Sequence, residues 1–192
     1  MYKLCKTEQS AERQRLLEEG LLSAMCRQRY EDISISELCE ELHISRKVFY
    51  RYFSGKDGAL HALLEHTMME FVSYLRAANS PEKNAYRDLE NFFCFWKDKK
   101  ALLDALSYSG MTGMLVNRIL DFAVKESHLP FRELAGDSKL MQEHMIRFCV
   151  CGMMVMVLTW HQNGYRESTG QMSQVAARLL TQPLITNPEV FM

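Results

Sequence analysis

The stretch from Ile33 to Lys56 constrains the fold most, because it has the pattern of two short helices joined by a tight turn. Ser34 is placed to cap the first helix, and Glu37, three residues later, completes an S-x-x-E capping box. Ser45 stands where the cap of a second helix belongs, and apolar residues follow it at helical spacing. Two such helices, separated by a turn of about three or four residues, predict a helix-turn-helix.

The second short helix is basic. It carries Arg46, Lys47 and Arg51, Lys56 follows it, and no acidic residue occurs between Leu42 and Lys56. A basic helix of this kind, with tyrosines between its charges, suits a groove lined by phosphates. The net charge of the whole chain is −1, but one basic face is enough for docking on nucleic acid.

This segment resembles the DNA-binding domain of the TetR/AcrR family of transcriptional regulators. The matching residues are Tyr30, Ile33, Ser36, Leu38, the run Ile44–Phe53 and the run Ser54–Asp57. One departure is His43, which stands in the turn where the family usually has glycine. Histidine tolerates a positive φ better than most other residues with a Cβ, so the turn remains compatible. The alternative is an ordinary helical hairpin with a few surface bases.

The resemblance and the chemistry of the side chains suggest how this segment contacts DNA. Arg46 and Lys47 are the candidates for reading guanine edges in the major groove, and Ser36 aligns with a base-proximal position of the family pattern. Tyrosine hydroxyls and Lys56 are candidates for phosphate contacts. Packing is the alternative for Tyr52, and Arg51 is equally well explained as a solvated base. The predicted DNA-binding residues are Ser34, Ser36, Ser45, Arg46, Lys47, Tyr50, Arg51, Tyr52 and Lys56.

Helical periodicity dominates the chain, and no convincing strand pattern is visible. The longer predicted helices cover about residues 8–27, 56–78, 82–97, 138–162 and 168–180, with two more on either side of Ser109-Gly110 and a loop over 128–137. Gly20 weakens the middle of the first helix by up to ~1 kcal/mol. We therefore expect an all-α, TetR-like protein with a three-helix head and a larger helical body. The expected domains are residues 1–55 for DNA binding and residues 56–192 for effector binding and dimerisation.

The run from Phe148 to Leu158 is apolar on every side, which predicts a helix buried all round. A small body cannot easily enclose such a helix, so we expect one side to meet a second subunit, with Gly152 allowing close approach. The last helix adds an apolar stripe formed by Met172, Val175, Ala176, Leu179 and Leu180. The resemblance implies a homodimer through the helices at about 138–162 and 168–180. The alternative is a purely intramolecular core.

The chain has 13 methionines, and large aromatic residues are frequent in the predicted body. Such side chains make an adaptable apolar interior, and the resemblance implies a pocket for a small-molecule effector there. We expect an apolar or aromatic effector, although ordinary core packing is the alternative for each residue. The effector-binding candidates are Phe71, Tyr74, Phe92, Trp96, Tyr108, Met111, Met114 and Met153.

Other classes of protein receive little support. The sequence has no Gly-rich phosphate loop, no H-E-x-x-H and no G-x-S-x-G, so we expect no enzyme and no cofactor. The six cysteines lack C-x-x-C or Cys/His ligand spacing. Buried structural thiols are the main interpretation, with redox sensing or metal binding as alternatives. The N-terminus lacks an apolar signal region, and the apolar run at 148–158 is shorter than the ~20 residues of a membrane span. We expect a cytoplasmic protein without a membrane partner.

These features together predict a ligand-responsive transcriptional regulator, in particular a repressor that occupies an operator in double-stranded DNA. An effector that prefers the non-binding arrangement of the two heads would release it. The alternative is a protein-interaction adaptor or co-activator whose body binds a partner protein. Salt-dependent binding to promoter DNA distinguishes the two.

Overall fold

The computed structural model describes residues 7–78, 85–125 and 138–181. These residues form nine α-helices and one short 3₁₀ turn, and no strand occurs among them, as the sequence predicts. The elements are α1 (Glu8–Met25), η1 (Tyr30–Asp32), α2 (Ile35–Glu41), α3 (Arg46–Tyr52), α4 (Lys56–Ala78), α5 (Ala85–Asp98), α6 (Lys100–Tyr108), α7 (Thr112–Lys125), α8 (Lys139–Gln162) and α9 (Thr169–Thr181). The predicted loop at 128–137 lies outside the described residues.

The chain divides into two compact units. The first unit comprises residues 1–72 and 99–122, and the second comprises residues 73–98 and 123–192. The three helices of the head, α1 to α3, therefore share a unit with α6 and most of α7. The expected assignment of DNA binding to residues 1–55 and of effector binding and dimerisation to 56–192 concerns activities, and it stays a prediction.

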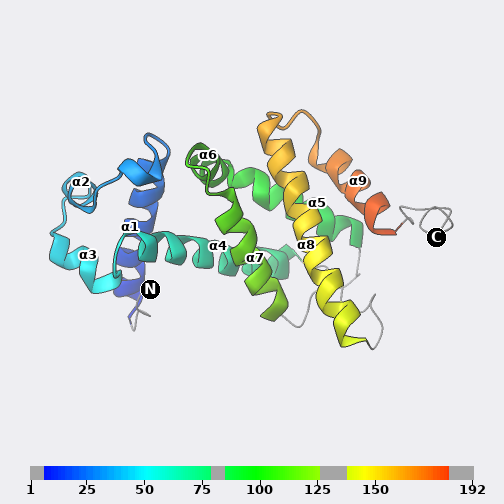
Figure 1. Cartoon of the computed structure of the whole chain (residues 1–192), viewed down its shortest axis with the longest axis horizontal. Coiled ribbons are helices and arrows are strands. Elements are labelled where there is room, and N and C mark those ends of the chain that lie inside the picture. The colour runs from blue at the N-terminus through cyan, green and yellow to red at the C-terminus, as the bar shows by residue number, and fades with distance from the viewer. Residues whose placement is uncertain (1–6, 79–84, 126–137, 182–192) are drawn as a thin grey trace. The chain divides into compact units, whose positions relative to one another are not determined.

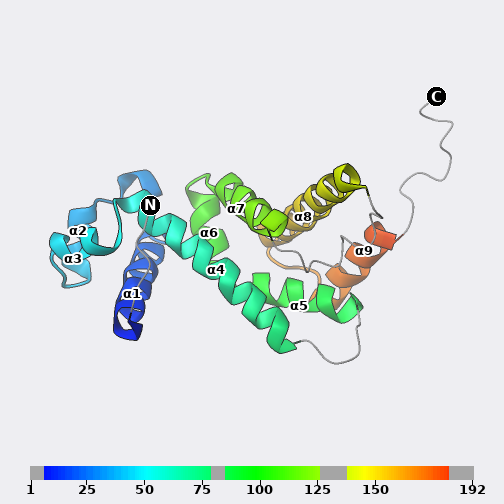
Figure 2. The same ribbon diagram turned by 90° about the horizontal axis from the view of Figure 1, so that it is seen from below.

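The head is held together by capped helices and an apolar interior. Thr7 caps α1 by accepting the Ser10 N–H at 3.2 Å, and Ser34 caps α2 by accepting the Glu37 N–H at 3.1 Å. In Figures 1 and 2, α2 and α3 lie side by side next to α1. The largest buried side chains of the head and the start of α4 are Leu17, Leu21, Met25, Leu38, Phe49, Phe53, Leu60 and Leu64.

Gly20 has a packing role as well as a cost to the helix. A Cβ built at this position would lie 2.6 Å from Cδ1 and 3.1 Å from Cγ of Leu42. Leu42 is the C-cap residue of α2. Real Cβ atoms do not approach other carbon atoms this closely. The absence of a Cβ at Gly20 therefore leaves room for the Leu42 side chain to pack against α1.

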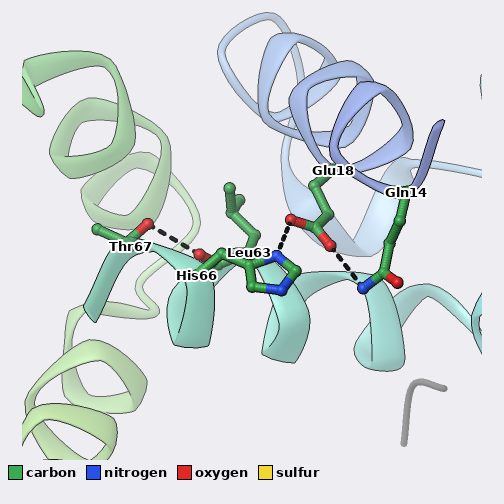
Figure 3. A network of polar contacts seen from close by, with 5 residues as sticks. All are labelled: Gln14, Glu18, Leu63, His66 and Thr67. Carbon is green, nitrogen blue, oxygen red and sulfur yellow. Dashed lines mark hydrogen bonds and ion pairs between the residues drawn. The ribbon is translucent and has the colours of Figure 1, made fainter. Parts of the chain in front are cut away.

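Buried polar side chains join α1 to α4 within the first unit (Figure 3). Glu18 of α1 is only 2% exposed. One of its carboxylate oxygens accepts from the Gln14 amide at 3.1 Å, and the other lies 2.7 Å from Nδ1 of His66 on α4. A buried carboxylate is tolerated when its oxygens have such partners.

In the second unit, α5 packs against α9 and also contacts α8. Aromatic rings fill the interior: Phe93 meets Trp160 edge-on at 5.8 Å, and Trp160 meets Tyr165 edge-on at 4.8 Å. The Trp160 N–H donates to the Glu167 carbonyl at 3.1 Å, which satisfies the polar atom of this buried indole.

The helix α8 departs from the prediction of burial on every side. Val150, Met153 and Val157 are buried, but Phe148 is 70% exposed and Val155 is 57% exposed. The predicted stripe of α9 is also divided. Met172 and Ala176 are buried, Leu180 is half-buried, and Val175 and Leu179 are about half exposed. Each helix thus uses one apolar face inside its unit and leaves a second apolar face outside.

The whole of α8 is longer than its central apolar run. Among the described helices, it alone has the length and hydropathy of a membrane span. A helix that is buried on one face and apolar on the other meets the same criterion without any membrane. The packing of α8 on α5 accounts for its inner face.

Candidate nucleic-acid interface

The helix α3 has an apolar inner face and a polar outer face. Phe49 is fully buried, and Tyr52 is 5% exposed. Phe49 packs against Phe53 with their ring centroids 5.4 Å apart. Arg46, Lys47, Tyr50 and Arg51 are exposed, and α3 itself is labelled in Figure 1. The sequence pattern thus places an acid-free basic surface on a helix that is anchored by aromatic residues.

The turn between α2 and α3 is a tight one. The N–H of Ile44 donates to the Cys39 carbonyl at 2.9 Å, and the N–H of His43 donates to the Glu40 carbonyl at 3.1 Å. His43 adopts a φ of 51°, which lies in the left-handed region usually taken by glycine. The expectation that histidine replaces glycine in this conformation is confirmed.

The exposed arginine at the start of α3 is partly preorganised. The Arg46 guanidinium lies over the Tyr50 ring, 5.9 Å from its centroid, which is within the range of a cation–π contact. The Tyr50 ring itself meets Phe49 edge-on at 5.7 Å. Lys47, beside Arg46 in the first turn, is exposed. Arg46 and Lys47 both lie in the first turn of α3, and their predicted role in reading base edges stays a prediction.

The three predicted serines are in different situations. The Ser34 hydroxyl already accepts the Glu37 N–H, and Ser36 is half-buried in the first turn of α2. Ser45 caps α3 with its backbone carbonyl, which accepts from Val48 at 2.8 Å, while its exposed side chain makes no capping hydrogen bond. A Ser45 hydroxyl in this position can turn toward a phosphate oxygen.

Two predicted phosphate contacts have competing partners inside the protein. The buried Tyr52 hydroxyl accepts from Ser10 Oγ at 3.5 Å, so packing, the alternative interpretation, describes its position better. The Lys56 ammonium donates to the backbone carbonyls of Tyr30, Glu31 and Ile33, the last at 2.8 Å. It also lies over the Tyr30 ring at 4.4 Å. The structure therefore places Lys56 as a clamp on the segment before α2 rather than as a free cation facing solvent.

The sequence patterns did not reveal this clamp or its surroundings. The Tyr30 hydroxyl donates to Asp57 Oδ1 at 2.5 Å. Burial and this hydrogen bond raise the pKa of Tyr30 well above its usual value, so the hydroxyl stays protonated and donates. In the sequence, only the family resemblance singles out Tyr30. A lysine followed by an aspartate at the start of a helix gives no signal of partners about 25 residues earlier in the chain.

The effector candidates lie in both units. Phe71, Tyr108, Met111 and Met114 belong to the first unit, and Tyr74, Phe92, Trp96 and Met153 belong to the second. In the second unit, Phe92 meets Trp96 at 6.5 Å, and Phe95 contacts both Tyr74 and Trp96. Tyr108 is 55% exposed, so it lies at the surface of the protein rather than in its interior. Their role in binding an effector stays a prediction.

The described cysteines have varied environments. Cys39 and Cys149 are buried, and burial raises the pKa of both thiols. Cys94 and Cys151 are half-buried, whereas Cys26 at the end of α1 is exposed, contrary to the expectation for this thiol. Cys5 lies outside the described residues. No group of three or more His, Cys, Asp or Glu side chains in the described ranges is arranged to hold a metal ion.

Comparison of the sequence with protein families gives one match at the site just described. Residues 27–63 match the model for bacterial regulatory proteins of the tetR family. Over 92 residues the chain is 27% identical to YxbF, an HTH-type transcriptional regulator of Bacillus subtilis. This segment covers 47% of the present chain and 23% of YxbF, so the chain spans less than a quarter of the length of this curated relative.

Several solved structures share the whole fold. The fatty acid degradation regulator FadR from Bacillus halodurans superposes with a TM-score of 0.64 and 13% identity, covering 94% of this chain and 98% of FadR. A transcriptional regulator from Aquifex aeolicus VF5 gives 0.60 with 16% identity, covering 87% and 96%. A TetR-like regulator from Rhodococcus sp. RHA1 gives 0.59 with 17% identity, covering 94% and 100%. At these identities the likeness establishes the fold.

We predict that Lys56→Met destabilises the head. The substitution keeps the length of the side chain but leaves three backbone carbonyls without their charged donor, a loss of about 1–3 kcal/mol. Urea denaturation of the purified protein measures it, with Lys47→Met as the matched control, because Lys47 is exposed. If Lys56→Met instead keeps its stability and loses affinity for random duplex DNA, Lys56 is a phosphate contact, as its position in the sequence first indicated.

Proposed function

We propose that this chain, whose helix-turn-helix belongs to the TetR family of bacterial regulatory proteins, represses transcription as a homodimer that an apolar small molecule releases from its operator. The observation that carries this proposal is the exposed basic face of α3, a helix whose opposite face is buried through aromatic side chains. The family match is to DNA-binding transcriptional regulators rather than to enzymes. The place of action is the bacterial cytoplasm, where such regulators meet DNA.

In this proposal α3 enters the major groove. Arg46 and Lys47 read guanine edges, and Tyr50, Arg51 and Ser45 contact phosphates. Ser34 and Ser36 lie at the start of α2, which crosses the backbone in helix-turn-helix complexes. The primary test is selection of duplexes from a random library with the full-length protein, followed by titration at several salt concentrations. A selected sequence and a linear fall of log affinity with log salt support a specific DNA-binding protein.

The homodimer is proposed to form through the outer apolar faces of α8 and α9. On α8, Phe148, Gly152 and Val155 are exposed at spacings of four and three residues, which places them on one helix face. A Cβ at Gly152 would meet no atom within 4 Å, so a partner helix can approach there. Val175 and Leu179 of α9 are exposed four residues apart. A two-fold axis through these faces makes a four-helix interface.

The effector is proposed to be largely apolar, because aromatic residues and methionine dominate the interior of the second unit. Apolar burial supplies most of the binding energy in such sites, and one or two polar groups fix the orientation. The likeness in fold to a fatty acid degradation regulator adds aliphatic acids to the compounds worth testing. Release follows if the bound ligand changes the separation of the two recognition helices, about 34–36 Å for adjacent major grooves.

We predict that Lys47→Ala weakens binding to the selected duplex by about 1–3 kcal/mol and relaxes the base preference at one or two positions. Lys125→Ala, which removes the same charge from the exposed end of α7, is the matched control and should bind within about twofold of the parent. Fluorescence anisotropy with the selected and a scrambled duplex measures both. Equal affinities for the parent and both variants would show that α3 does not enter the groove.

We predict that Val155→Glu converts the dimer to a monomer, because the carboxylate would be buried without a partner at the subunit contact. Met69→Glu is the matched control, because Met69 on α4 is 56% exposed and Val155 is 57% exposed. Sedimentation velocity at micromolar concentration measures the oligomeric state. A parent protein that sediments as a monomer and still binds the selected duplex with full affinity contradicts the proposed interface.

We predict that aromatic or aliphatic carboxylic acids raise the melting temperature of the protein and weaken its binding to the selected duplex. Zn²⁺, Mg²⁺ and ATP are the comparison compounds. The chain has two tryptophans, Trp96 and Trp160, and both are buried in the second unit. Their fluorescence therefore reports ligand binding there independently of DNA. A saturable effect of a metal or of ATP, with all apolar compounds inert, would reverse the assignment of the effector class.

A further inference from the structure

Helix α6 is attached to the head at both of its ends, within the first unit. At its start, the Cys26 thiol at the end of α1 donates to the Ala101 carbonyl at 3.6 Å. At its end, the backbone N–H of Tyr30 donates to the Ser109 hydroxyl oxygen at 3.0 Å. Tyr30 lies directly before the helix-turn-helix and is 7% exposed. The second contact thus joins residues that are 79 positions apart in the sequence.

The turn that carries Ser109 has a well-defined conformation. The N–H of Met111 donates to the Leu106 carbonyl at 2.7 Å, and the N–H of Gly110 donates to the Ser107 carbonyl at 3.1 Å. Gly110 has a φ of +68°, so the pattern is that of a glycine-capped helix end. Ser109 therefore cannot move unless the turn between α6 and α7 rearranges.

On the other side, Tyr30 is firmly connected to the start of α4 and to α2. Its hydroxyl donates to Asp57, and its carbonyl accepts from Lys56. Lys56 also holds the carbonyl of Ile33, which directly precedes Ser34, the cap of α2. A displacement of Tyr30 is therefore passed to the first residue of the helix-turn-helix through backbone contacts and a charged clamp.

Two of the effector candidates that belong to the first unit lie next to this turn. Tyr108 and Met111 flank Ser109 and Gly110 directly. Tyr108 is 55% exposed and Met111 is half-buried, so both can change position without opening a core. A molecule that contacts either side chain acts on the turn that holds the N–H of Tyr30.

We propose that the Ser109–Tyr30 hydrogen bond transmits rearrangements of the α6–α7 turn into the helix-turn-helix and so controls operator affinity. The proposal rests on the proposed function and specifies its regulation. It differs from transmission through α4 alone. That route would use a separate contact of the first unit, between α7 and α4. Arg118 of α7 donates to Nδ1 of His61 on α4 at 2.5 Å. Burial and the Arg118 charge lower the pKa of His61, which keeps its ring a neutral acceptor.

The test strains the turn without adding a contact. Gly110→Ala places a Cβ on a residue with φ +68°, where the space around the Cβ is open for 4 Å, so only the backbone is strained. Gly164→Ala is the matched control, because Gly164 has φ +71° and equally open surroundings but lies in the turn before α9, in the second unit. Gly110→Asn is the rescue variant, because asparagine tolerates the left-handed conformation.

We expect Gly110→Ala to weaken binding to the selected duplex about fivefold. The backbone strain of one alanine in the left-handed conformation is large enough to cause a loss of affinity of this size. Gly164→Ala and Gly110→Asn should stay within about twofold of the parent. Adding Gly110→Ala to a Ser109→Ala protein should cause no further loss, whereas adding it to Arg118→Ala should still cause the fivefold loss. Equal effects at Gly110 and Gly164, no effect at Gly110, or full additivity with Ser109→Ala would each overturn the proposal.

Hydrogen exchange provides a second measurement that requires no DNA. In Gly110→Ala, the amides of Tyr30 to Leu38 should exchange faster than in the parent, while in Gly164→Ala they should not. If the parent binds no duplex, the proposed function fails, and this measurement still decides whether the turn is coupled to the helix-turn-helix. Thermal melting identifies a variant that is simply unfolded, and in that case Ser109→Ala alone must raise exchange at Tyr30 for the proposal to stand.

Discussion

A helix of seven residues such as α3 is not stable in water through its own hydrogen bonds, so its position depends on what its inner face buries. Phe49, Tyr52 and Phe53 supply that face, and each is at most 5% exposed. Burial of a large apolar side chain contributes about 1.5–3 kcal/mol. These three residues therefore keep the helix in place while its basic side chains remain in solvent. The exposed basic side chains can change rotamer without moving the helix, because the buried aromatic side chains hold its backbone in place.

Local signals in the sequence predicted the parts of the fold that depend on local contacts. The helix α4 begins and ends at the predicted residues, and Ser34 caps α2 with its side chain. The positive φ of His43 was expected because the family that this segment resembles usually has glycine there. Caps, breaks and apolar spacing act within about four residues, so a single sequence contains the information needed to locate them.

Contacts between distant residues could not be predicted in the same way. Nothing near Gly20 indicates that Leu42 lies on it, and a glycine inside a helix is read only as a cost. Lys56 has the sequence environment of a phosphate contact, yet its ammonium donates to backbone carbonyls more than 20 residues away. Composition likewise grouped Tyr108 with interior aromatic residues, although it is exposed. In each case the identity of the neighbour, rather than that of the residue, decides its role.

The division of the chain into compact units explains why α6 and α7 are suited to regulation. The expected boundary at residue 55 places every helix after α3 in an effector-binding body. In the structure, α6 and most of α7 belong to the same compact unit as the head. Ser109 and Arg118 then act on Tyr30 and His61 inside one unit. In the proposed coupling, a change in these helices reaches the head through hydrogen bonds within the first unit, and no rearrangement of the second unit is required for it. Coupling of this kind needs only a turn with two stable arrangements, and a glycine-capped turn at the protein surface is a good candidate for such an element.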